Sequence, residues 1–61
     1  MDEHLTKAQD CAQFAVDDLR QALAGADPVA GIVLLSLIER AVSLTLSIRT
    51  LLEASQEAKH G

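Results

Sequence analysis

One short segment, Gly25-Ala26-Asp27-Pro28, holds the only proline of a chain that otherwise favours helix throughout. Gly25 suits the left-handed position that follows the last residue of a helix. The Asp27 side chain can cap the next helix, and Pro28 fits its first turn, where a backbone N–H would have no intrahelical acceptor. Two helices joined by so few residues pack antiparallel. The segment therefore predicts an all-α fold built as a helical hairpin.

These signals make residues 1–61 a single hairpin domain, with a first helix at about 3–24, a turn at 25–27 and a second helix at about 28–58. A chain of 61 residues buries a small core and usually depends on disulfides, a metal or oligomerisation. There is one cysteine, Cys11, and the two histidines lie near opposite ends of the chain. We therefore expect no metal and no other cofactor, and oligomerisation remains as the source of extra stability.

The first helix is amphipathic. Its apolar residues recur every three or four positions, which predicts one stripe facing the second helix. Because alanine is frequent in this stripe, we expect the two helices to approach closely. The stripe comprises Leu5, Ala8, Ala12, Ala15, Val16, Leu19, Ala22 and Leu23.

The second helix is apolar on more than one side. One set of residues keeps a four- and three-residue spacing, and we expect this predicted seam to face the first helix. Another set is expected on the back of the helix, where a two-helix monomer has no interior to bury it. The predicted seam comprises Ala30, Leu34, Leu37, Ala41, Leu44, Ile48 and Leu51, flanked by Val33 and Leu52. The back row comprises Leu35, Ile38, Val42 and Leu46.

We therefore expect two hairpins to form a homodimeric four-helix bundle with the second helices at its centre. The only aromatic residue, Phe14, points away from the stripe of the first helix, and interfaces are enriched in aromatic side chains. The expected function is a small protein-binding or assembly module, an adaptor or regulator, whose partner is a second copy or another helical protein. The predicted interface comprises Phe14, Leu35, Ile38, Val42, Leu46, Leu51 and Leu52.

In architecture alone, the hairpin resembles the short co-chaperones of type III secretion needle subunits, and also the dimerising hairpin of the plasmid copy-number regulator Rop. The layout is bacterial-like in this sense. The same apolar face leaves open an alternative function, a co-chaperone or antitoxin-like subunit that binds a different protein, and the first resemblance agrees with the co-chaperone. The turn at 25–28 is general hairpin chemistry, so neither resemblance assigns a role to a particular residue.

A further alternative is a membrane-associated peptide, since residues 29–52 are long enough to cross a bilayer. Glu39, Arg40 and Arg49 interrupt this stretch, and each costs up to about 2.5–3.5 kcal/mol near the bilayer centre, whereas each Leu, Ile or Val returns only about 0.3–0.6 kcal/mol. The balance disfavours insertion. The acidic N-terminus does not resemble a secretory signal, and with a single thiol we expect a cytoplasmic protein.

The charge pattern disfavours other functional classes. A formal net charge of −4 with scattered basic residues argues against nucleic acid as a partner of this small acidic chain. We do not expect an enzyme, because the adjacent carboxylates of Asp17 and Asp18 do not face each other on a helix and no base lies beside the serines of the second helix. Glu39 and Arg40 are interpreted as part of a solvated strip, with an interchain salt bridge that fixes register as the alternative.

Overall fold

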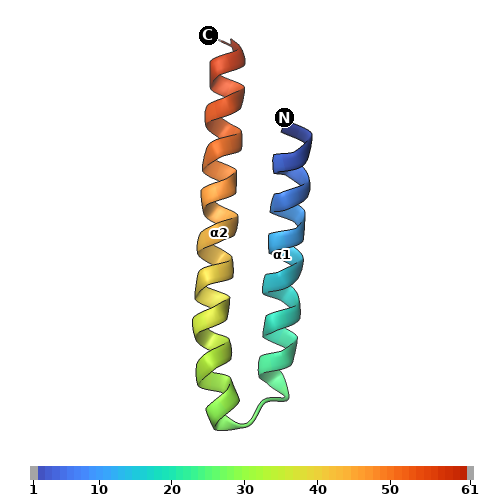
Figure 1. Ribbon diagram of the computed structural model, residues 1–61, viewed down its shortest axis with the longest axis vertical. Helices are drawn as coiled ribbons and strands as arrows, with labels where there is room; N and C mark the ends of the chain where they lie inside the picture. The colour runs from blue at the N-terminus through green and yellow to red at the C-terminus, as the bar shows by residue number, and fades with distance from the viewer. Residues whose placement is uncertain (1, 61) are drawn as a thin grey trace.

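The computed structural model describes residues 2–60, and it describes their side chains from Glu3 to Glu57. Two helices, α1 (Asp2–Ala24) and α2 (Pro28–His60), lie side by side and antiparallel, as Figure 1 shows. The predicted all-α hairpin is confirmed, and residues 2–60 contain no strand. α2 has 33 residues against 23 in α1, so it extends past the start of α1 (Figure 1). The molecule is a rod of 50 × 15 × 12 Å.

α1 ends at Ala24, where the sequence pattern places its last residue, but the hydrogen bonds of its last turn differ from the predicted ones. The N–H groups of Gly25 and Ala26 donate to the carbonyl oxygens of Ala22 and Leu23, both at 3.2 Å. These bonds tighten the last turn and satisfy two carbonyls that the helix leaves free. No glycine among residues 2–60 has a positive φ, so the prediction that Gly25 adopts the left-handed conformation is wrong.

Gly25→Ala is therefore expected to be neutral or to stabilise the hairpin by up to about 1 kcal/mol. The backbone already suits a residue with a side chain, and no atom lies within 4 Å of the added Cβ. Alanine also restricts the unfolded chain more than glycine does. Thermal unfolding followed by circular dichroism measures the change, and a clear loss of stability would mean that Gly25 is left-handed in solution after all.

The start of α2 is fixed by the two residues that the sequence singles out. The Ala30 N–H donates to Oδ1 of Asp27 at 2.8 Å, which is the expected N-cap. The Gly31 N–H donates to the carbonyl oxygen of Asp27, also at 2.8 Å, and begins the helical bonding pattern. Pro28 occupies the first helical position, where its missing N–H costs nothing. The short turn then directs α2 back along α1.

The core of the hairpin is a narrow line of contact at mid-length. Ala12, Val16 and Ile48 are its buried apolar residues, and Val16 is only 2% exposed. Thr45 is buried beside them at 4% exposure and lines a crevice between the helices together with Val16. Its hydroxyl donates to the carbonyl oxygen of Ala41 at 2.9 Å, so this polar group is satisfied within its own helix and can be buried at little cost.

The row of α2 that packs against α1 differs from the predicted seam. Leu37, Leu44 and Leu51 belong to that seam but are 39%, 54% and 57% exposed. Ile38 and Val42, expected on the back, are half-buried instead. The orientation of α2 thus differs by about 60° from the predicted one, because the small Gly31 and the self-satisfied Thr45 lie toward α1. Among the described side chains of α2, the buried and half-buried ones are Gly31, Leu34, Ile38, Ala41, Val42, Thr45, Ile48, Leu52 and Ser55.

Candidate interaction surface

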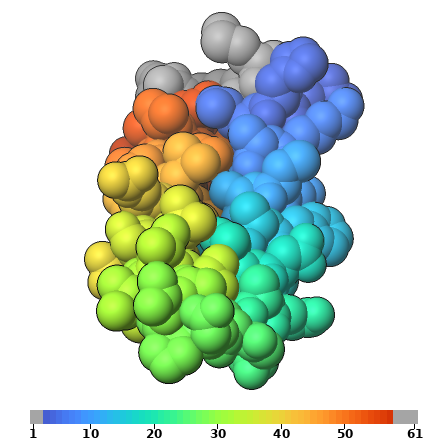
Figure 2. Space-filling view, turned by 60° about the horizontal axis from the view of Figure 1, so that its bottom comes forward, coloured from blue at the N-terminus to red at the C-terminus, as the bar shows by residue number. Residues whose placement is uncertain are grey.

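The hairpin exposes more surface than a folded protein of its mass usually does. Its accessible area is 4719 Å² for a chain of 6.5 kDa. A folded monomer of that mass exposes roughly 3,800 Å², so the excess is about 900 Å². A standard stable interface buries about 800 Å² on each partner. The space-filling view shows the described parts of the two helices lying side by side, with neither covering the other on the face in view (Figure 2).

The surface divides into two sides along the line where the helices meet. On one, which we call the crevice side, the helices share a hollow lined by Gln13, Val16, Arg20, Val42, Thr45, Leu46 and Arg49. Counting about 100° per residue from the buried Val16 and Thr45, the side chains of Ala15 and Leu44 turn the other way. They therefore lie on the opposite side of the hairpin from this hollow.

On that opposite side, each helix presents an exposed row with seven-residue spacing, the spacing of helices that pack in bundles. The alanine row of α1 consists of Ala8, Ala15 and Ala22. The leucine row of α2 consists of Leu37, Leu44 and Leu51, and Val33, 57% exposed, widens it near the turn. Counting about 100° per residue places both rows on this side of the hairpin, and we call them together the alanine–leucine face. The alanines were predicted to pack within the hairpin, but the structure leaves them exposed.

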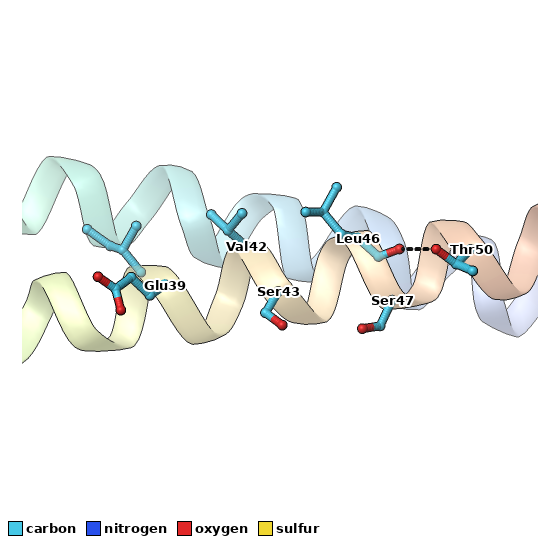
Figure 3. A pocket seen from close by; sticks show the side chains of 7 residues that line it. Glu39, Val42, Ser43, Leu46, Ser47 and Thr50 are labelled. Carbon is cyan, nitrogen blue, oxygen red and sulfur yellow. Dashed lines mark hydrogen bonds between the residues drawn. The ribbon is translucent and has the colours of Figure 1, made fainter.

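α2 carries a further apolar feature, an open hollow of about 470 Å³ that shares Val42 and Leu46 with the crevice and continues onto the back of the helix (Figure 3). In this view Val42 and Leu46 point to one side of α2 and the Ser43 and Ser47 side chains to the other. The Thr50 hydroxyl donates to the carbonyl oxygen of Leu46 at 3.0 Å, shown as a dashed line. The hollow thus lies along one helix and mixes apolar with polar side chains. Its lining consists of Ile38, Glu39, Val42, Ser43, Leu46, Ser47 and Thr50.

The residues predicted to form the interface do not share one surface. Ile38, Val42 and Leu52 are half-buried in the hairpin. Leu35 and Leu46 are 52% and 51% exposed and lie toward the crevice side.

Two further residues of that prediction lie elsewhere. Leu51 belongs to the leucine row. Phe14 is 69% exposed beside Asp10, Gln13 and Asp17, on a part of α1 that faces away from α2. The predicted interface did not include Leu37 and Leu44, because their regular spacing was attributed to packing within the hairpin.

The remaining polar chemistry of the described chain is sparse. Among the described side chains, no three His, Cys, Asp or Glu residues gather closely enough to hold a metal ion. Asp17 accepts a hydrogen bond from Nε2 of Gln13 at 3.2 Å, within α1. Cys11 is an exposed free thiol. The apolar surfaces are therefore the most developed candidate site on the hairpin.

α2 also meets the length and composition of a membrane span. The stretch Pro28–Glu57 reaches a mean hydropathy of 1.9, and only 6% of its most apolar part is buried in the hairpin. A helix at the centre of a soluble assembly has the same properties, because its apolar surface is covered by other chains. The length and composition of α2 therefore fit a helix inside a soluble assembly as well as a membrane span.

No protein-family model matches this sequence, and no curated protein and no solved structure is significantly similar to it. The functional argument accordingly depends on the geometry of the two sides of the hairpin.

Proposed function

We propose that this chain is a small protein-interaction module that pairs with a second copy of itself through the alanine–leucine face, forming a homodimeric four-helix bundle. The observation that carries the proposal is the coincidence of two exposed rows, one on each helix, on the same side of one hairpin. In a four-helix bundle every helix contributes a row of this spacing to the common core. A module of this kind serves as an adaptor or as a small regulator.

The crevice side supports such a bundle less well. A bundle core needs an apolar surface on α1 as well as on α2. On the crevice side α1 presents Gln13 and Arg20, and α2 adds Arg49. Burying these groups without partners would cost free energy that the apolar contacts of Leu46 have to offset. The alanine–leucine face carries no such group between its two rows.

Self-pairing, rather than capture of a different protein, is supported by the area and shape of the face. The excess exposed area of the hairpin is close to one partner's share of a standard interface. The face also combines small side chains on α1 with large ones on α2, so a second copy offers the complement of each row. A different helical protein, as in the co-chaperone or antitoxin-like alternative, would need to supply the same complement.

Sedimentation equilibrium on the purified natural chain tests the proposal. We expect a dimer whose midpoint of thermal unfolding rises with protein concentration, because dissociation accompanies unfolding. A well-ordered monomer at micromolar concentration would rule out self-pairing. A molten or aggregating chain that one partner protein rescues would support the co-chaperone alternative instead.

Membrane association is the second candidate, favoured by the apolar length of α2. In that case the leucine row would face lipid rather than a second copy. Co-sedimentation with liposomes of neutral phospholipid separates the two: the proposed dimer stays in the supernatant, and a membrane peptide pellets with the vesicles. Glu39, Arg40 and Arg49 lie within the apolar stretch and weigh against insertion.

A further inference from the structure

We infer that in this dimer α1 of each copy packs against α2 of the other, with both turns at the same end of the bundle, and that an ion pair between Asp18 of one copy and Arg40 of the other closes the rim of the interface. The inference rests on the proposed self-pairing and adds the arrangement of the helices. It follows from where the exposed residues lie along the rod and from the sizes and charges of their side chains.

A hairpin can pair with itself through one face in two ways. When the two-fold axis runs along the bundle, α1 neighbours α2 of the second copy and the turns lie at one end. When the axis runs across the bundle, α1 neighbours α1, α2 neighbours α2, and the turns lie at opposite ends. Both arrangements keep neighbouring helices antiparallel. They differ in which side chains meet across the interface, so the sizes and charges of those side chains distinguish them.

The two rows run along the same length of the rod. The crevice is lined by residues 13–20 of α1 and 42–49 of α2, so these two stretches lie side by side. Nearer the turn, Cδ1 of Leu23 lies 3.6 Å from the position that a Cβ on Gly31 would take. Because both helices rise by about 1.5 Å per residue in opposite directions, the alanine row and the leucine row extend beside each other from the turn toward the far end of α1.

A two-fold axis along the bundle leaves every residue at its own level. The leucine row of one copy then packs against the alanine row of the other. Large side chains packed against small ones keep the helix spacing short and uniform along the interface. An axis across the bundle would set leucines against leucines and alanines against alanines, which gives two unequal helix spacings. The sizes therefore favour the axis along the bundle.

The charges at the edges of the two rows agree with this arrangement. Asp18 lies within the stretch of α1 that lines the crevice, and Arg40 lies two residues nearer the turn than Val42, which lines the crevice from α2. An axis along the bundle therefore brings the long Arg40 side chain of one copy alongside Asp18 of the other. Both point toward the outer edge of the alanine–leucine face. No ion pair joins either side chain to another within the described chain.

The acidic residues of α2 lie on a different part of that helix from Arg40. Glu39, Glu53 and Glu57 are about 100–140° around α2 from Arg40. An α2–α2 contact would therefore leave Arg40 without an acidic neighbour. The carboxylate that a second copy places within its reach is that of Asp18.

Cross-linking through single thiols tests the helix arrangement. Cys11 lies at the edge of the alanine row and Ser47 at the edge of the leucine row. The natural chain and the Cys11→Ser/Ser47→Cys variant each carry one thiol. We expect a short bis-maleimide reagent to give covalent dimers only when the two chains are refolded as an equimolar mixture. The same mixture with Leu44→Glu in both chains controls for random collisions.

The outcomes separate this inference from the proposed function. Covalent dimers in each single-thiol sample, and none specific to the mixture, would overturn the inferred arrangement while leaving self-pairing intact. A chain that sediments as a monomer overturns the proposed function itself, and the inference with it.

Charge exchange tests the ion pair. At low salt, Asp18→Arg and Arg40→Asp should each weaken the dimer about tenfold, because each variant sets two pairs of like charges across the interface. The double variant Asp18→Arg/Arg40→Asp should return to within about threefold of the natural dissociation constant. Asp17→Arg lies on the crevice side and is the matched control, which Arg40→Asp should not rescue. A double variant no tighter than the two single ones would overturn the ion pair.

Discussion

Leu44→Glu is expected to convert the dimer into a monomer, raising its dissociation constant by at least about 100-fold. Leu44 is the middle residue of the leucine row, and the substitution would bury two carboxylates in each dimer. The monomer should be less helical than the dimer, because dissociation accompanies unfolding. The substitution itself costs the hairpin little, since Leu44 is 54% exposed there and glutamate is a good helix former. Sedimentation equilibrium measures the association, and circular dichroism measures the helix content that remains.

Leu46→Glu provides a closely matched control. Leu46 is 51% exposed, lies two residues further along the same helix and undergoes the same chemical change, but it points to the crevice side. We expect this variant to dimerise within about fivefold of the natural chain, since its charge stays in water. If Leu46→Glu dissociates the dimer and Leu44→Glu does not, the back row predicted from the sequence is the true interface and the alanine–leucine face is not.

Val16→Asp is expected to unfold the chain at every concentration. Val16 is the one fully buried side chain among those described. The substitution removes apolar contact at the centre of the hairpin and places an unpartnered carboxylate there, at a cost of about 3–5 kcal/mol. Such a loss exceeds what a two-helix core of this size can supply. Far-ultraviolet circular dichroism should show loss of helix that higher protein concentration does not restore.

Phe14→Asp, two residues away on α1, controls for the charge. Phe14 is 69% exposed and faces away from α2, so both the helix content and the dimer should persist. Loss of the dimer with the helices intact would place Phe14 in the interface, as the sequence predicts. A Val16→Asp chain that stays helical would show that the two helices are held together elsewhere than at mid-length.

The turn and the helix ends could be predicted from the sequence because they depend on local chemistry. Asp27 caps α2 through a residue three positions away, and Pro28 acts through its own ring. The orientation of α2 could not be predicted in the same way. α2 is apolar over most of its circumference, so several rows satisfy the same spacing. In the structure the row that contains Thr45 faces α1. Its hydroxyl can be buried there because it donates a hydrogen bond to the Ala41 carbonyl oxygen.

The candidate interface could not be predicted from the sequence for a related reason. The spacing of Leu37, Leu44 and Leu51 is visible in the sequence, and so is that of the three alanines on α1. A periodic apolar row predicts that something covers it, but the pattern is the same whether the covering helix belongs to the same chain or to another. Only the three-dimensional arrangement shows that α1 and α2 meet along a neighbouring row and leave these residues exposed.

The antiparallel path of the two helices also determines how the chain can hold other molecules. α1 begins and α2 ends toward the same pole of a rod 50 Å long, as Figure 1 shows. Anything tethered to either end of the chain is therefore carried at that pole, far from the turn. In a pair with both turns at one end, the other four helix ends would lie together at the opposite end. Such a dimer would bring molecules attached to its two chains within one bundle's width of each other.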